Sequence, residues 1–108
     1  LLKAAEAGDL TTVRRLVETK SVNVEAKDNI GYTSLIWAAR RGHIDTVRYL
    51  VEKANANVEA KTNNGDTPLM LAARNGHIDT VRYLVEKANA NVEAKNDYGR
   101  TPLIWAAR

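Results

Sequence analysis

The stretch GHIDTVRYLVEKANANVEAK occurs twice, at residues 42–61 and, letter for letter, at 76–95. The offset is 34 residues, and the same step relates Gly31, Gly65 and Gly99. A fixed period of this size is typical of short units that stack in a row, each burying its apolar face against the next. The sequence therefore predicts a single repeat array over residues 1–108. Its units are a partial repeat at 1–30, full repeats at 31–64 and 65–98, and a partial repeat at 99–108 with a first helix only.

Each unit is predicted to contain two short helices followed by an extended turn. Thr67-Pro68 is typical of an N-cap followed by proline at the first helical position, and Gly76 is typical of a left-handed helix stop. A second helix is expected from His77 to a stop near Asn89, with its apolar residues on one face of a 3.6-residue period. Those residues are Ile78, Val81, Leu84 and Val85. Helices of two or three turns are unstable alone in water, so stacking should supply most of the stability.

The segments GDTPLMLAARNGH (65–77) and GRTPLIWAAR (99–108) resemble the T-P-L-H-x-A signature of ankyrin repeats. The resemblance implies an all-α solenoid of helix-turn-helix units joined by extended β-turn fingers. The period here is 34 residues rather than about 33, and we place the extra residue at the end of the second helix, in LVEKANA. Ser34 replaces the signature's proline in one unit. Apolar residues replace its histidine at Ile36, Met70 and Ile104.

The composition narrows the class of protein. Of the 108 residues, 44% are hydrophobic and 27% are charged, which is ordinary for a soluble domain. The longest apolar runs are a few residues, too short for a helix to span a bilayer, so no membrane partner is expected. Cysteine is absent, which excludes disulfides and thiolate metal sites. Because a chain without cysteine suits a reducing compartment, we expect a cytoplasmic, intracellular location.

The sequence contains no catalytic constellation, so we expect a protein that is not an enzyme and that holds no cofactor or metal. His43 and His77 are its only histidines. Equivalent residues of stacked helices lie roughly 8–10 Å apart, too far to share a metal bound at about 2.0–2.1 Å from each nitrogen. Each histidine is instead expected to cap the second helix of its unit, where the first unit has Asp9.

The two full repeats differ at eight of 34 positions, all of them in the turn or the first helix. The pairs are Tyr32/Asp66, Ser34/Pro68, Ile36/Met70, Trp37/Leu71, Arg41/Asn75, Thr62/Asn96, Asn63/Asp97 and Asn64/Tyr98. The second helix is unchanged even at Asp45, Thr46, Arg48 and Glu52, which we expect to be exposed. Because loops on a rigid scaffold often carry function, the turns and first helices are the predicted binding surface.

The resemblance to ankyrin repeats implies a non-catalytic protein-protein interaction module that uses finger tips and the groove of the first helices. Carried over residue by residue, the contact set is Asn29, Ile30, Tyr32, Arg40, Arg41, Asn63, Asn64, Asp66, Arg74, Asn75, Asp97, Tyr98 and Arg100. Trp37 is added because tryptophan and arginine are over-represented among residues that dominate interfaces, and it shares a helical face with Arg41. Trp105 is its equivalent in the last unit.

The charges are expected to divide by surface. On the second helices, i,i+4 pairs should neutralise each other: Arg14/Glu18, Arg48/Glu52 and Arg82/Glu86. The turn and groove side is basic, with Lys27, Arg40, Arg41, Lys61, Arg74, Lys95, Arg100 and Arg108 against Asp28, Asp66 and Asp97. An acidic protein partner is therefore expected, since complementary potentials raise the rate of encounter.

Two other functions fit parts of the pattern. Near-identical repeats are also typical of a structural or engineered scaffold with no specific partner. Tyr32, Trp37 and Tyr98 interleave with the basic residues, as in nucleic-acid binders. However, the sequence has neither a recognisable nucleic-acid module nor a strong concentration of basic residues, so nucleic acid is the less favoured partner.

The ends of the array are expected to be partly apolar. Leu1 and Leu2 align with Leu35 and Ile36 in the middle of a first helix. Repeat arrays generally need polar capping units, and without one the last unit would leave Leu103, Ile104 and Trp105 partly bare. Such ends favour end-to-end self-association through a heterologous contact that need not close.

Overall fold

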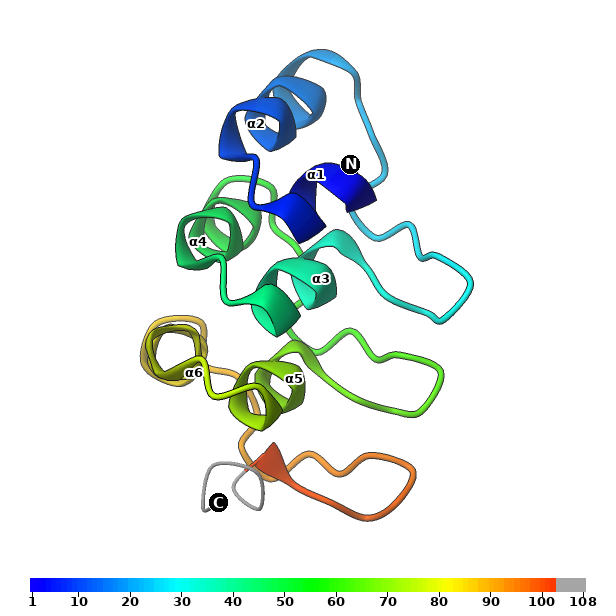
Figure 1. The fold of residues 1–108 in the computed structure, drawn as a ribbon, viewed down its shortest axis with the longest axis vertical. Helices are drawn as coiled ribbons and strands as arrows, with labels where there is room; N and C mark the ends of the chain where they lie inside the picture. Colours follow the sequence, from blue (N-terminus) through cyan, green and yellow to red (C-terminus); the bar gives the residue numbers. More distant parts are fainter. Residues whose placement is uncertain (103–108) are drawn as a thin grey trace.

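A computed structural model describes residues 1–102, and in those residues helices are the only regular elements. The helices are α1 (Leu2–Ala7), α2 (Leu10–Thr19), α3 (Ser34–Arg41), α4 (Ile44–Glu52), α5 (Pro68–Arg74) and α6 (Ile78–Glu86). Helices α1, α3 and α5 form an inner row and α2, α4 and α6 an outer row (Figure 1). The segment after each outer helix projects sideways as a finger. The predicted all-α solenoid of helix-turn-helix units is confirmed.

Local capping signals explain where the helices begin and end. Thr33 and Thr67 have extended backbones, and their hydroxyls accept hydrogen bonds from the amides of Ile36 and Met70, three residues further along the chain. Asn55 and Asn89 end the outer helices in the left-handed region, with φ of 55° and 57°. Each end is a wide turn: the amide of residue 56 donates to the carbonyl of residue 50, six positions back. This turn lies where the sequence places the extra residue.

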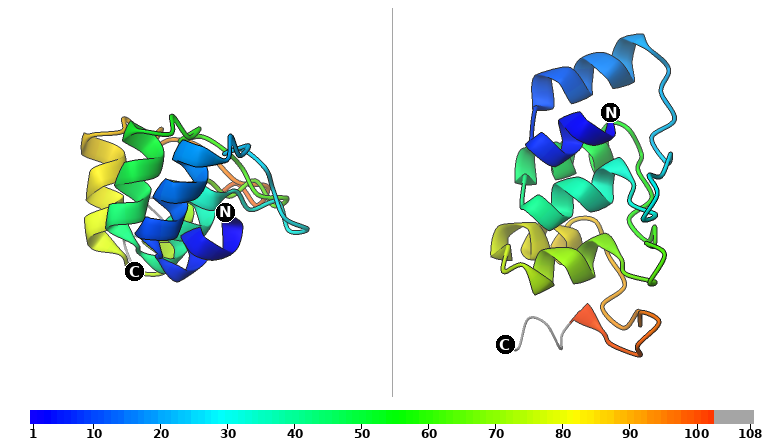
Figure 2. Two further views of the ribbon diagram at one scale, coloured as in Figure 1. Left: turned by 90° about the horizontal axis from the view of Figure 1, so that it is seen from above. Right: turned by 45° about the vertical axis from the view of Figure 1, so that its right-hand side comes forward.

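The core lies between the two helix rows and continues through every seam between repeats. Leu35, Leu50, Leu69 and Leu84 are at most 2% exposed and belong to one apolar cluster. Seen along the stack, the outer and inner helices lie in parallel layers with the fingers to one side (Figure 2). Fully burying a leucine contributes about 1.5–3 kcal/mol. Stacking therefore supplies the stability that such short helices lack.

A second, smaller cluster sits beneath the fingers. Ile36 and Leu71 are at most 1% exposed and pack with Ala60, and Tyr32 leans against them. Met70 is likewise fully buried. The positions where the family signature has histidine are therefore filled by apolar packing in the two described full repeats.

The fingers are joined to one another by backbone hydrogen bonds. The amide of Asn63 donates to the carbonyl of Ile30 at 3.3 Å, and the amide of Asp97 donates to Asn64 at 2.9 Å, one repeat further on. Gly31 has φ of 82°, and a Cβ there would lie 2.7 Å from the Asn63 nitrogen. Glycine is required both by the backbone conformation and by the close approach of the next finger. The finger tips are therefore held in a row by the backbone itself.

The two histidines cross the seams, which corrects the prediction that they cap their own helices. His43 and His77 occupy the N-cap positions of α4 and α6, but neither makes a side-chain cap hydrogen bond. Their Nε2 atoms instead lie 2.8 Å from the carbonyl oxygens of Glu6 and Arg40 in the preceding inner helix. Because a carbonyl only accepts, Nε2 is the donor. Asp9 does cap, accepting from the Thr12 amide and hydroxyl.

The outer helices interlock through tyrosine rather than through i,i+4 ion pairs. The Tyr83 hydroxyl donates to Glu52 of the preceding repeat at 2.7 Å, and Arg48 lies 5.5 Å from the centre of the Tyr83 ring. Tyr49 makes the same two contacts with Glu18 and Arg14 of the first repeat. Among the predicted pairs, Arg14–Glu18 alone forms an ion pair in the described residues, at 4.0 Å. Packing across the seam therefore accounts for the unchanged Arg48 and Glu52. The expected exposure of Thr46 is wrong, because it is 1% exposed.

We expect the stability contributed by Tyr83 to be lost in alkali. Burial, together with the hydrogen bond to Glu52 and its negative charge, raises the pKa of Tyr83 to about 12. The folded state therefore favours the neutral phenol, a contribution that is complete below the ordinary pKa of 10.0 and vanishes as the pH rises through about 12. Urea unfolding between pH 8 and 12 should show the stability advantage of the wild type over Tyr83→Phe shrinking above pH 10. An advantage that stays constant to pH 12 would contradict this assignment.

Candidate functional site

The predicted contact residues fall on one side of the molecule, named here the inner face: the finger turns at residues 28–32, 62–66 and 96–100, together with α1, α3 and α5. Most of them are exposed: Asn29, Ile30, Arg41, Asn63, Asn64, Arg74, Asn75, Asp97, Tyr98 and Arg100. Tyr32, Trp37 and Arg40 are half-buried, and Asp66 is buried. Two large apolar or aromatic residues are unusually exposed: Ile30 is 47% exposed and Tyr98 is 68% exposed.

Tyr32, Trp37 and Arg40 form a compact cluster on α3 and the finger before it. The two ring centroids are 4.7 Å apart, and the Arg40 guanidinium carbon lies 5.6 Å from the centre of each ring. Arg40 Nη1 also donates to the Tyr32 hydroxyl at 3.0 Å. Stacking and this hydrogen bond hold a long, flexible side chain in one arrangement.

Asp28 holds this cluster in place, a role that the sequence alone does not indicate. One carboxylate oxygen accepts from the amides of Ile30 and Tyr32, and the other accepts from Trp37 Nε1 at 2.8 Å. Burial opposes ionisation of Asp28, but these hydrogen bonds together outweigh it and lower the pKa of the carboxyl. Thr62 makes the equivalent pair of turn hydrogen bonds with its hydroxyl. The sequence does carry a sign of this role, because residues 28, 62 and 96 all have a side-chain hydrogen-bond acceptor at the same repeat position.

Arg41 is already engaged by a carboxylate of the neighbouring repeat. Its Nη2 lies 2.9 Å from Glu6 Oε2, and the guanidinium carbon is 5.7 Å from the centre of the Trp37 ring. Both partners of the ion pair are substantially exposed, so it contributes at most about 1 kcal/mol to stability. Its larger effect is to neutralise one of the arginines on which the predicted basic surface rests.

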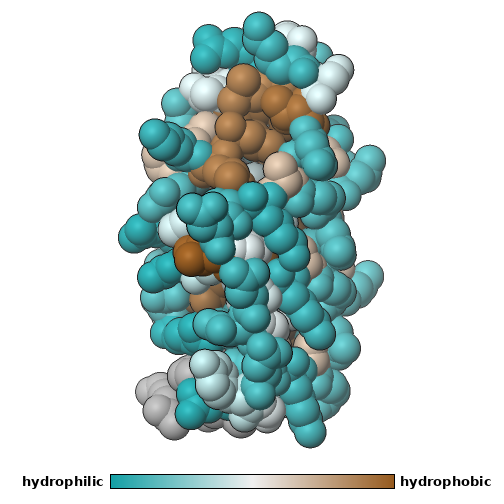
Figure 3. Space-filling model, turned by 90° about the vertical axis from the view of Figure 1, so that its right-hand side faces the viewer, coloured by the Kyte–Doolittle hydropathy of each residue, from teal (hydrophilic) through white to brown (hydrophobic). Residues whose placement is uncertain are grey.

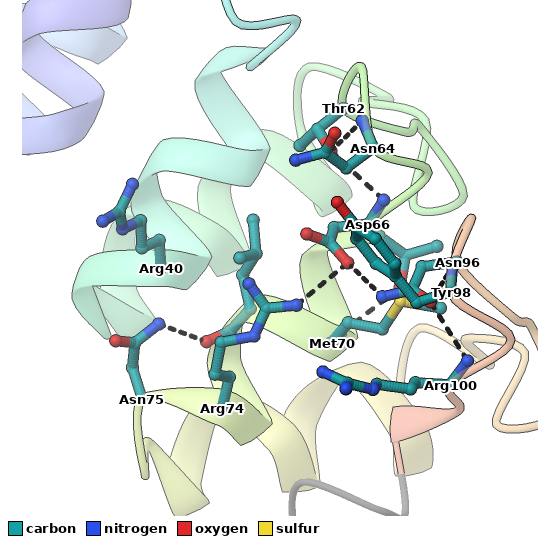
Figure 4. A network of polar contacts seen from close by, with 12 residues as sticks. Arg40, Thr62, Asn64, Asp66, Met70, Arg74, Asn75, Asn96, Tyr98 and Arg100 are labelled. Atoms are coloured by element: carbon teal, nitrogen blue, oxygen red, sulfur yellow. Dashed lines mark hydrogen bonds and ion pairs between the residues drawn. The ribbon is translucent and has the colours of Figure 1, made fainter.

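Asp66 is a correction to the predicted contact set, because it is only 5% exposed. Figure 4 shows its carboxylate turned inward, where it accepts from Arg74 Nη2 at 3.0 Å and from Asn96 Nδ2 at 2.9 Å. A buried carboxylate needs such partners, since an unpaired one is costly. Asp66 therefore links the second finger to α5 and to the next finger, and it is not available to a partner.

Asn75, Tyr98 and Arg100 lie exposed near the contacts that Asp66 makes with Arg74 and Asn96. Asn75 Nδ2 donates to the Leu71 carbonyl at 2.7 Å, so this amide closes the end of α5. Tyr98 lies next to Arg100, whose guanidinium carbon is 5.9 Å from the centre of the tyrosine ring. Arg108, Leu103, Ile104 and Trp105 lie outside the described residues. Tyr98 is thus the most exposed aromatic group of the described inner face.

The basic character of the inner face is smaller than the sequence suggests, because two of its arginines are ion-paired. Arg41 is paired with Glu6 and Arg74 with Asp66. No carboxylate of residues 1–102 lies within ion-pair distance of Arg40. Of the three arginines on α3 and α5, Arg40 is therefore the one without a carboxylate partner in residues 1–102.

The finger side is otherwise mostly hydrophilic, with an apolar patch at the end formed by the first repeat (Figure 3). A hollow of about 440 Å³ at that end is lined by Leu1, Leu2, Lys3, Val22, Asn23 and Ala26. Two further hollows lie between the outer helices, of about 230 and 320 Å³. Their linings are equivalent residues 34 positions apart, so they are seams of the stack.

Fold and surface together define a helical-repeat solenoid with a firm row of projecting turns. Comparison with sequence families identifies which solenoid: the family model described as ankyrin repeats, in three copies, matches residues 1–62 and 55–108. The chain belongs to the ankyrin-repeat family. A comparison with curated proteins finds no match. No helix in residues 1–102 is long and apolar enough to cross a membrane, and no three potential metal ligands gather there.

Proposed function

We propose that this chain is a non-catalytic binding module that holds an acidic protein partner on its inner face. Ankyrin repeats generally mediate protein–protein interaction. What carries the proposal is the half-buried Tyr32–Trp37–Arg40 cluster beside a finger tip that exposes Ile30. Tyrosine, tryptophan and arginine dominate the energetics of most interfaces. Their arrangement in one rigid patch favours this surface over the outer helices.

Rigidity also supports the proposal. The finger turns are built by side-chain hydrogen bonds at residues 28, 62 and 96, and backbone hydrogen bonds join each finger to the next. A surface that is ordered before binding loses less conformational entropy when a partner docks. On the outer helices, by comparison, Arg48 and Glu52 are already in contact with Tyr83.

The compensation of Arg41 and Arg74 argues against nucleic acid as the partner. A nucleic-acid surface needs several uncompensated cations that follow a phosphate backbone. Here Glu6 and Asp66 neutralise two of the arginines on the inner helices. The remaining charge suits a protein surface with a few acidic side chains.

A displayed library of twelve-residue peptides, selected on the immobilised protein, tests this function. We expect Trp37→Ala and Tyr98→Ala each to weaken the selected peptides by roughly ten- to a hundredfold, as loss of a hot-spot residue does. Arg48→Ala, on the outer row, is the control and should leave affinity within about threefold. Circular dichroism should show unchanged helix content in all three variants. Peptides that respond to Arg48→Ala but not to the other two would place the binding surface on the outer helices.

A further inference from the structure

We infer that Arg40 is the anchor of the inner face and that it binds a single carboxylate, the side chain of an aspartate or glutamate in the partner. This inference rests on the proposed function and specifies its chemistry. The starting observation is that the three arginines of the described inner helices are held differently. Arg41 and Arg74 each face a carboxylate at 2.9–3.0 Å, whereas Arg40 faces two aromatic rings and a hydroxyl.

Arg40 is prepared for such a ligand by its surroundings. Tyr32 and Trp37 cover the guanidinium, and Asp28 fixes the Trp37 ring through its indole N–H. Of the five N–H donors of an arginine, one is directed at the Tyr32 hydroxyl. The others can bind a carboxylate with two parallel hydrogen bonds, the arrangement in which arginine is most selective. Partial burial strengthens that contact relative to an exposed ion pair.

The charge balance points to a monovalent group. Arg41 is paired with Glu6, and Asp28 is held by neutral N–H donors, whereas Arg40 has no carboxylate of residues 1–102 within ion-pair distance. A carboxylate would neutralise the guanidinium of Arg40 with one charge. A phosphate group carries about −1.5 to −2 at pH 7 and would meet repulsion from Glu6 and Asp28. Sites for phosphorylated motifs use clusters of arginines instead.

The selected peptides described above supply the probe, and Arg41 supplies a matched control. We expect them to share an aspartate or glutamate at one position. Arg40→Gln should weaken binding about ten- to a hundredfold, the range expected for a charged hydrogen bond. Arg41→Gln, which removes a neighbouring charge that is already paired with Glu6, should weaken binding clearly less than Arg40→Gln does. The bond from His77 to the Arg40 carbonyl survives both changes, so the unfolding midpoint should stay near that of the wild type.

A double-mutant cycle makes the assignment specific. Replacing the acidic residue of the peptide by its amide should weaken binding to the wild type by the same factor and should have no further effect on Arg40→Gln. Arg40→Lys, which keeps the charge and loses the planar fork, should bind with intermediate affinity. It also serves as the test variant if Arg40→Gln unfolds.

The contrary outcomes are distinct. Equal losses of affinity for Arg40→Gln and Arg41→Gln, or additive losses in the cycle, would overturn the role of Arg40 as the anchor. If binding still depended on Trp37, the proposed function would stand. A peptide with phosphoserine in place of the acidic residue that bound about tenfold tighter through Arg40 would make the site a phosphate site. Insensitivity to every inner-face variant, or a selection that enriches no peptide, would reject both the anchor and the proposed function.

Discussion

Gly42→Ala should destabilise the protein by about 2–5 kcal/mol. Part of this loss is a backbone term, because φ at Gly42 is 74° and a left-handed L-residue costs roughly 1–2 kcal/mol. The larger part is a clash across the seam, since the new Cβ would lie 2.5 Å from Nδ1 of His77. Relieving it requires the imidazole to move away from the Arg40 carbonyl that it binds. Overpacking of this kind costs about 1–3 kcal/mol.

Gly76→Ala separates the two contributions. Gly76 has almost the same φ, 75°, but no described residue lies within 4 Å of the position a Cβ would take. It should therefore lose only the backbone term. Urea unfolding of both variants gives the seam clash as a difference, which should be about 1–3 kcal/mol. Equal losses would mean that the histidine does not lock the seam, even though both glycines lie at the same repeat position.

Leu50→Ala should lower the free energy of unfolding by about 2–5 kcal/mol, because it opens a cavity in a seam that packs on both sides. Leu50 is 0% exposed and its carbonyl also closes the end of α4 by accepting from the Ala56 amide. The substitution removes the side chain without touching that hydrogen bond. Lost packing is therefore the expected cause.

Ile78→Ala is the control for this prediction. Ile78 lies at the start of α6 on the same outer row, but it is 67% exposed. Its truncation should change the free energy of unfolding by no more than about 0.5 kcal/mol. Calorimetry or urea titration compares the two. A loss at Leu50 as small as that at Ile78 would show that the seams are not the source of stability.

The parts of the fold that depend on neighbours in sequence were predictable. Thr67, Gly76 and Asn89 act through their own backbone conformation or a partner three residues away, and the structure confirms the cap and both left-handed stops. The repeat period then placed these elements in a stack. The family resemblance correctly indicated the fold.

Contacts across the seams were not predictable in the same way. His77 and Tyr83 find partners 37 and 31 residues away, and Asp66 finds one 30 residues away. Which side chain faces which depends on the height and rotation of adjacent repeats, which no local pattern encodes. For this reason the sequence alone predicts caps at the histidines and an exposed contact at Asp66, and the structure contradicts both. The charge of Arg41 was overestimated for the same reason, since Glu6 is 35 positions away.

The most direct test of binding on the inner face is a map of amide chemical shifts in the labelled protein as a selected peptide is added. We expect the largest changes in the finger turns and in α3, with the Trp37 indole N–H among them because it hydrogen-bonds Asp28 inside the cluster. Changes concentrated in α4 and α6, around Arg48 and Arg82, with the finger turns unmoved, would contradict it.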